Sequence, residues 1–112
     1  MSYYDYKKCI EACLKCAALC NQCATACLQE EDVVMMANCI QLDMECATIC
    51  NAAAQLMSLG SHKSIEICKL CAQMCEACAD ECSKHDNEHC KECADECRSC
   101  AEECRSMSEM EA

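Results

Sequence analysis

Apolar and small residues recur along this chain in steps of three and four, and charged residues fill many of the positions between them. The clearest run begins at Cys9 and ends at Cys27, with steps of four, three, four, three and four residues. An α-helix turns once in about 3.6 residues, so these steps keep every position on one stripe of one helix. A helical bundle buries such a stripe in its interior. The run therefore predicts an amphipathic helix whose buried stripe is cysteine.

Three further segments repeat this spacing, and their stripes are also mostly cysteine. These stripes are Met36, Cys39, Asp43, Cys46, Cys50, Ala53 and Met57; Ile65, Cys68, Cys71, Cys75, Cys78, Cys82 and His85; and Cys90, Cys93, Cys97, Cys100, Cys104 and Met107. The predicted helices are approximately 3–29, 32–59, 62–84 and 87–107. Gly60 is expected to end the second helix as a left-handed C′ residue. Short connections favour antiparallel neighbours, so we expect residues 1–112 to form a single all-α, antiparallel up-down-up-down four-helix bundle with a cysteine-lined core.

Composition agrees with this fold and raises a question about the core. The 112 residues include one Gly and no Pro, Phe or Trp, which favours helices over strands. Nineteen residues are cysteine, far above the share that already marks a cysteine-scaffolded or metal-binding chain. Cysteine buries much less apolar area than leucine, so a core of cysteine is weakly stabilising. The pattern indicates that the sulfur has a chemical purpose.

Disulfides are one such purpose, and the compartment argues against them. The first eight residues, MSYYDYKK, do not resemble a secretory signal, so we expect a cytoplasmic protein, in which thiols stay reduced. Residues four apart on a helix have Cβ atoms about 5–6 Å apart, too far for a disulfide. No apolar run is long enough to span a membrane. The formal net charge of −11 argues against nucleic acid and anionic membranes as partners. A dithiol redox switch remains an alternative.

Metal binding is the second purpose, and thiolates select copper(I), zinc or iron–sulfur clusters. Several zinc ions, each bound by four thiolates, would leave much negative charge in a dry core. An iron–sulfur cluster resembling a ferredoxin needs a Gly- and Pro-containing loop, but the Cys68 to Cys75 run is predicted to be helical. Each copper(I) replaces one thiol proton with one positive charge, so shared thiolates keep the core neutral. Multiple copper(I) ions per chain are favoured, with a zinc-thiolate buffer or a redox or iron–sulfur electron-transfer protein as alternatives.

The candidate ligands include all the cysteines and four other side chains. The cysteines are Cys9, Cys13, Cys16, Cys20, Cys23, Cys27, Cys39, Cys46, Cys50, Cys68, Cys71, Cys75, Cys78, Cys82, Cys90, Cys93, Cys97, Cys100 and Cys104. At one bundle end, Met36, His85 and His89 add weaker soft or borderline donors that suit copper uptake and release. Asp43 lies on the buried stripe, where a carboxyl must be partnered, protonated or a ligand; the sequence leaves both a structural and a metal role open.

Other residues at the ends are assigned packing or surface roles. The opposite end is expected to be closed by an apolar plug of Tyr6, Met57, Ile65 and Met107. His62 is expected to lie on the surface there. Met35, Met44, Met74 and Met110 are expected to be packing residues.

The CxxxCxxCxxxCxxC run from Cys9, the segment Cys39-Ile40-Gln41-Leu42-Asp43 and the corner from His85 to Cys90 together resemble the cytosolic branch of the bacterial copper storage proteins. The resemblance covers essentially the whole chain. It implies a homotetramer of four-helix bundles, with inward cysteines that bind many copper(I) ions and with histidines at the open end. The sequence has no nucleophile, base and orienter arrangement, no Gly-rich phosphate loop and no open metal site of the catalytic kind, so we expect storage without catalysis, with copper-donating or copper-accepting proteins or small thiols as partners. Asn87 and Glu88 depart from the more histidine-rich corner of some members.

Overall fold

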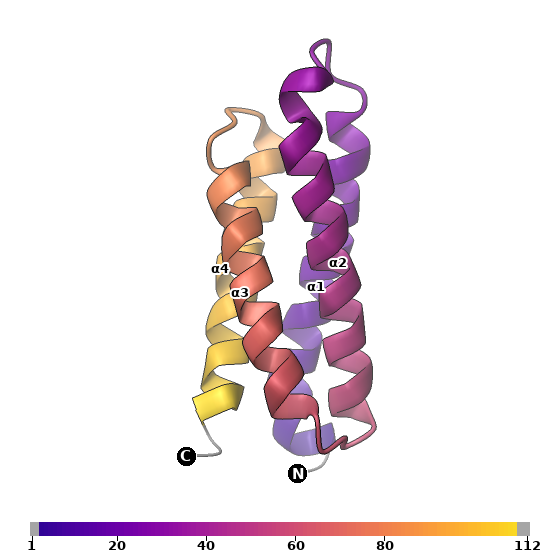
Figure 1. Ribbon diagram of the computed structural model, residues 1–112, viewed down its shortest axis with the longest axis vertical. Helices are drawn as coiled ribbons and strands as arrows, with labels where there is room; N and C mark the ends of the chain where they lie inside the picture. Colours follow the sequence, from indigo (N-terminus) through magenta and orange to yellow (C-terminus); the bar gives the residue numbers. More distant parts are fainter. Residues whose placement is uncertain (1–2, 110–112) are drawn as a thin grey trace.

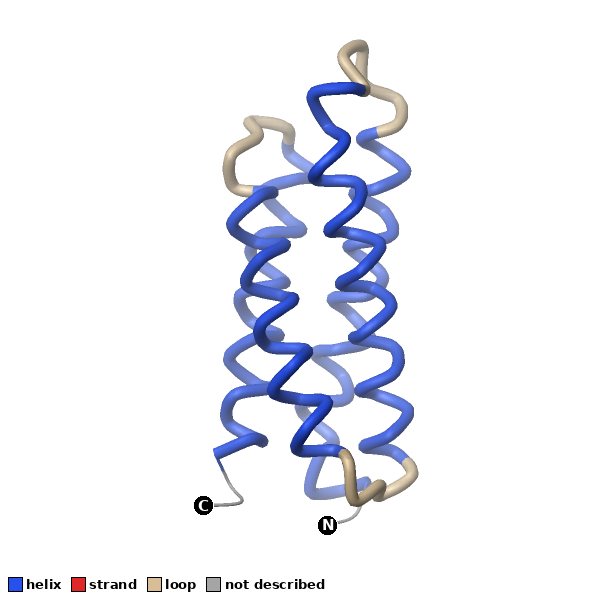
Figure 2. The backbone as a smooth tube through the Cα atoms, in the orientation of Figure 1, coloured by secondary structure: helices blue, strands red, loops and turns tan. Residues whose placement is uncertain are grey.

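A computed structural model of the chain describes residues 3–109, and within this range it contains helices and no strand. The helices are α1 (Tyr3–Cys27), α2 (Ala37–Ser58), α3 (Ser64–Cys82) and α4 (Glu88–Glu109), with a short 3-10 turn, η1 (Val34–Met36), before α2. Successive helices run in opposite directions and form an elongated bundle (Figures 1 and 2). Helix α1 packs against α2 and α4, and α3 packs against the same two helices. The predicted all-α four-helix bundle is confirmed.

The helix ends follow from local chemistry. The second helix is predicted to begin at residue 32, whereas α2 begins at Ala37. Asp32 stabilises the turn that contains η1 instead, because its Oδ1 accepts a hydrogen bond from the backbone N–H of Met35 at 3.1 Å. Gly60 follows α2 with a φ of 67°, the left-handed conformation expected of a C′ glycine. The N–H of Ser61 bonds to the carbonyl of Leu56 at 3.0 Å and completes this cap. The result is a tight reversal between α2 and α3.

The core consists of sulfur and small side chains. All nineteen cysteines are fully buried, so the predicted inward direction of every cysteine stripe is confirmed. Alanines at neighbouring positions, among them Ala17, Ala47 and Ala72, pack beside the cysteines. Both termini lie at the end of the bundle where α2 ends and α3 begins (Figure 1). Near the corresponding helix ends, Tyr6, Met57 and Ile65 are buried, and Met107 is partly buried against the core. The core is therefore a narrow column of thiols with larger side chains at that end.

Two residues assigned to packing are exposed, and that prediction is wrong. Met35 exposes 67% of its surface and Met44 exposes 58%. Met35 lies in η1, and Met44 follows the buried Asp43 by one residue, so the helical turn carries it away from the core. Met74 is half-buried, and Met110 lies outside the described residues. His62 is exposed, as expected.

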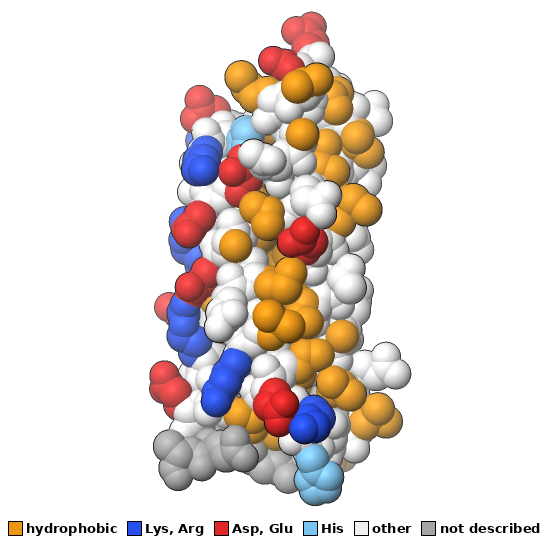
Figure 3. All heavy atoms as spheres, in the orientation of Figure 1, with side chains coloured by type: hydrophobic (Ala, Val, Ile, Leu, Met, Phe, Trp, Pro, Cys, Tyr) orange, Lys and Arg blue, Asp and Glu red, His pale blue; other side chains and the backbone are white. Residues whose placement is uncertain are grey.

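The surface divides into an apolar and a charged part. Figure 3 shows apolar side chains running down one face of the bundle, beside a band in which Lys, Arg, Asp and Glu alternate. Tyr4, Val34, Leu59 and Met44 are among the large apolar residues that are exposed. None of the described helices is both long and apolar enough to cross a membrane.

Candidate metal centre

The thiols of different helices meet at short distances along the core. The Sγ atoms of Cys39 and Cys82 are 3.4 Å apart between α2 and α3, and those of Cys16 and Cys97 are 3.6 Å apart between α1 and α4. Thiols four residues apart on one helix are also close, with Cys16 and Cys20 separated by 4.0 Å. All nineteen thiols are free. Two metal–sulfur bonds of about 2.3 Å at a trigonal angle span roughly 4.0 Å, so this spacing fits an ion held between sulfurs.

Groups of four thiols that could hold one ion overlap along the column. In each group, the sulfurs lie within 4.8 Å of one another. Five of these groups are Cys13, Cys71, Cys100 and Cys104; Cys16, Cys46, Cys50 and Cys75; Cys16, Cys20, Cys46 and Cys97; Cys20, Cys78, Cys93 and Cys97; and Cys23, Cys27, Cys39 and Cys90. Cys16, Cys20, Cys46 and Cys97 each belong to two of them, so adjacent sites must share ligands. Closed structural zinc sites use four ligands of their own, whereas this column favours bridging thiolates.

Asp43 occupies a ligand-like position within the column. Its Oδ1 accepts hydrogen bonds from the thiols of Cys78 at 3.2 Å, Cys93 at 3.3 Å and Cys82 at 3.4 Å, and its Oδ2 accepts one from Cys39 at 3.7 Å. The side chain is fully buried. Removal from water and the nearby Cys93 thiol raise the pKa of this carboxyl to about 10. The carboxyl is therefore protonated near neutral pH in the metal-free core, where it replaces a sulfur on the α2 stripe.

His89 points its ring into the sulfur column at the end opposite the termini. Its Nδ1 lies 3.5 Å from the Sγ atoms of both Cys23 and Cys90, and 4.0 Å from that of Cys27. Its Nε2 lies 3.2 Å from Oε1 of Glu30. When Nε2 carries the proton and donates it to Glu30, Nδ1 has a free lone pair that faces three thiols. Burial raises the pKa of Cys90 to about 12 and raises that of Cys27 above its ordinary value.

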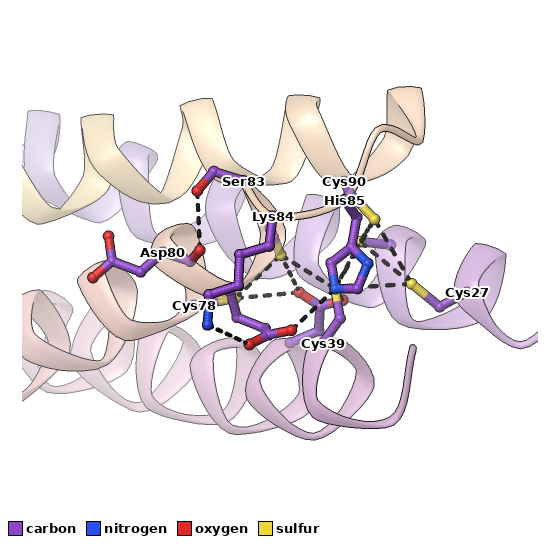
Figure 4. A network of polar contacts seen from close by, with 12 residues as sticks. Cys27, Cys39, Cys78, Asp80, Ser83, Lys84, His85 and Cys90 are labelled. Atoms are coloured by element: carbon purple, nitrogen blue, oxygen red, sulfur yellow. Dashed lines mark hydrogen bonds and ion pairs between the residues drawn. The ribbon is translucent and has the colours of Figure 1, made fainter. Parts of the chain in front are cut away.

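His85 lies at the same end of the bundle and also pairs with a carboxylate. Its Nε2 is 3.0 Å from Oε2 of Glu81, whose Oε1 lies 3.4 Å from Nζ of Lys84. Figure 4 views this end with His85, Cys27, Cys39 and Cys90 labelled, and these side chains gather where α1 and α3 end and α2 and α4 begin. Met36, which immediately precedes α2, is almost fully buried. Met36, His85 and His89, which were predicted to line the mouth of the bundle where copper enters, therefore lie at the same end.

Two carboxylates that contact the histidines were not predicted from the sequence. Glu81 lies in the last turn of α3, and His85 follows it by four residues, just beyond the end of that helix, so this short spacing could have been recognised. Glu30 lies in the turn after α1, far from His89 in sequence, and no local spacing connects them. Carboxylates that bond to the second nitrogen of a metal-binding histidine fix its tautomer and orientation.

Comparison with known proteins identifies the fold's relatives. No curated protein matches the chain. The Cu(I)-bound copper storage protein BsCsp3 is 51% identical, with a TM-score of 0.88 over 91% of this chain and 96% of that one. The metal-free copper storage protein 3 from Bacillus subtilis is also 51% identical, with a TM-score of 0.87 over 91% of this chain and 97% of that one. A cytosolic copper storage protein from Streptomyces lividans, holding five coppers, is 40% identical, with a TM-score of 0.90 over 93% of this chain and 92% of that one.

The sequence profile of the family described as "copper storage protein" matches residues 2–109, nearly the whole chain. The cysteine clusters of the core fit copper binding, and two of the similar structures hold bound copper. From the profile match and the similarity to these structures, we conclude that this chain belongs to the copper storage protein family.

Proposed function

We propose that this chain stores copper(I) in the cytosol by binding many ions through its inward thiolates, and that it has no catalytic activity. The observation that carries the proposal is the continuous column of nineteen free, fully buried thiols, with neighbours close enough to share ions. The similar structures, a Cu(I)-bound copper storage protein and a cytosolic copper storage protein holding five coppers, support the same function. The homotetramer that the family resemblance implies belongs to this proposal.

Copper(I) fits the column better than the alternatives because of charge and geometry. Each copper(I) that displaces a thiol proton leaves the dry core neutral, whereas four thiolates around each zinc leave two negative charges. Overlapping groups such as those that share Cys16 and Cys46 demand bridging thiolates. A compact iron–sulfur cluster needs four thiolates that bind that cluster alone, whereas overlapping groups of thiols in this column share members.

The end that carries the histidines is the proposed route for copper into and out of the core. Imidazole and thioether bind copper(I) less tightly than thiolate, so His85, His89 and Met36 can pass ions inward without trapping them. The Nδ1 of His89, directed at Cys23 and Cys90, supports this role. We assign Asp43 as an oxygen ligand deeper in the column, because its carboxyl oxygens reach four thiols from three helices.

An anaerobic titration of the reduced protein with copper(I) against a coloured chelator tests the function. We expect a plateau near about one copper per cysteine, with the chelator outcompeted throughout, because the thiolates can bridge neighbouring ions. A parallel zinc titration should give much weaker or less extensive binding. Saturation at only a few copper ions, or zinc binding of equal strength, would contradict the storage proposal.

Replacing both mouth histidines should slow copper uptake and leave most of the capacity. In the His85→Ala/His89→Ala variant, we expect the rate of copper transfer from a chelated donor, measured by stopped flow, to fall about tenfold or more. The thiol column that sets the capacity is unchanged in this variant. His62→Ala is the matched control, because His62 is exposed outside the mouth, and it should transfer copper at the original rate. An unchanged rate in the double variant would place the route elsewhere.

A further inference from the structure

Met57 brings a thioether to the sulfur column at the end of the bundle where both termini lie. The side chain is fully buried on α2, and its Sδ lies 3.5 Å from Sγ of Cys68 on α3, whose thiol points at it. That distance matches the separations between thiols elsewhere in the core, such as 3.6 Å between Cys50 and Cys71. The thioether sulfur is therefore as close to its neighbouring thiol as the candidate thiol ligands are to one another.

Two further helices supply thiols at this level. The Sγ atoms of Cys9 on α1 and Cys104 on α4 are 3.7 Å apart. Cys68 lies one helical turn before Cys71 on α3, and the thiols of Cys71 and Cys104 lie within 4.8 Å of each other, so Cys68 belongs to the same end of the column. The four helices thus contribute one sulfur each, three thiols and one thioether. Met57 fills the place that a fourth cysteine from α2 would take.

A purely structural plug does not require sulfur at this position. Leucine has a similar volume and would close the bundle end equally well. The position of Sδ beside a thiol is instead the arrangement that a soft metal needs, because thioether sulfur is a ligand for copper(I). A thioether is also neutral. It adds a donor atom at the end of the column without adding a charge that a further ion would have to balance.

We infer that Met57, with Cys9, Cys68 and Cys104, forms a terminal copper(I) site at the end of the bundle where both termini lie. The inference rests on the proposed storage function. It extends the copper-binding column beyond its cysteines, and it turns one residue of the apolar plug into a ligand. The thiols at this level also face the next group, since Cys104 lies 3.8 Å from Cys13. The terminal ion would therefore share a thiolate with its neighbours.

Selenium X-ray absorption of selenomethionine-labelled protein tests this site. The Met36→Leu background removes the methionine proposed at the mouth. This variant retains Met57. After full anaerobic loading with copper(I), we expect it to show selenium–copper scattering at bonding distance. The Met36→Leu/Met57→Leu protein should lose that scattering and bind about one copper fewer per chain. Leucine conserves the volume of Met57, so the bundle should remain folded, and circular dichroism checks this.

The possible outcomes separate the site from the function. If the Met36→Leu protein binds many copper ions but shows no selenium–copper scattering, or if the scattering persists without Met57, the terminal site is overturned and storage stands. If the protein binds only a few copper ions, the storage function fails and the terminal site fails with it. Selenium–copper scattering that depends on Met57, in a protein loaded with many ions, supports both.

Discussion

Loading the reduced protein with copper(I) should raise its melting temperature by more than about 30 °C. The metal-free core is weak, because cysteine and alanine bury little apolar area compared with leucine or isoleucine. Copper bound between the helices would replace weak thiol contacts with metal–sulfur bonds. Such contacts join Cys39 to Cys82 and Cys16 to Cys97. Each ion that binds the folded state more tightly than the unfolded state adds to its stability, and many ions add together.

The gain in stability should be smaller than the summed binding energies, because an unfolded chain with nineteen thiols also binds copper(I). Thermal unfolding followed by circular dichroism, at increasing copper per chain and without oxygen, measures the effect. The Cys46→Ala/Cys50→Ala variant is an informative comparison. It removes the thiols by which α2 meets Cys75 and Cys71 of α3, so copper should stabilise it less. A melting temperature that does not rise with copper would mean that the ions bind outside the folded core.

The bundle and its sulfur column could be predicted because one physical rule decides them. Steps of three and four residues fix which side of a helix each cysteine occupies, and a buried stripe must face the other helices. The same rule placed Asp43 inside, but it could not show which thiols would surround the carboxyl. Cys39 precedes Asp43 by four residues on α2, but the other three partners come from α3 and α4 and depend on how the helices are staggered. Register between helices is a property of packing and does not follow from spacing along one helix.

Features outside the stripe were less predictable for a related reason. Met35 and Met44 are apolar, but their positions on η1 and α2 face solvent, and composition alone could not reveal this. The contact between Glu30 and His89 joins a turn to the first residues of α4 and depends on the path of the chain between α1 and α2. The contact between Met57 and Cys68 likewise depends on how α2 and α3 meet beyond Gly60. These contacts lie at the bundle ends, where helical periodicity stops specifying neighbours.

The other large effect concerns the metal-free state and the buried carboxyl. Asp43→Asn should remove a pH dependence of stability that the original side chain imposes. The pKa of Asp43 is raised from 3.8 to about 10 in the folded protein, chiefly by removal from water. Below pH 3.8 the carboxyl is protonated in both states. Between these two pKa values, unfolding releases a proton, so the stability contributed by the neutral carboxyl is lost as pH rises.

Each pH unit in this window should lower the free energy of unfolding by about 1.4 kcal/mol, or up to about 4 kcal/mol between pH 5 and pH 8. The Asp43→Asn variant keeps an oxygen near Cys78 and Cys93 but has no carboxyl to ionise. Urea unfolding of the reduced, metal-free proteins at several pH values measures the difference in slope, which isolates Asp43 from the thiols common to both. Asp95→Asn makes the same substitution at an exposed position of α4 and should leave the slope unchanged. Equal slopes in the original protein and Asp43→Asn would show that the buried carboxyl is already ionised before copper arrives, and that its four thiol contacts are bonds to a carboxylate.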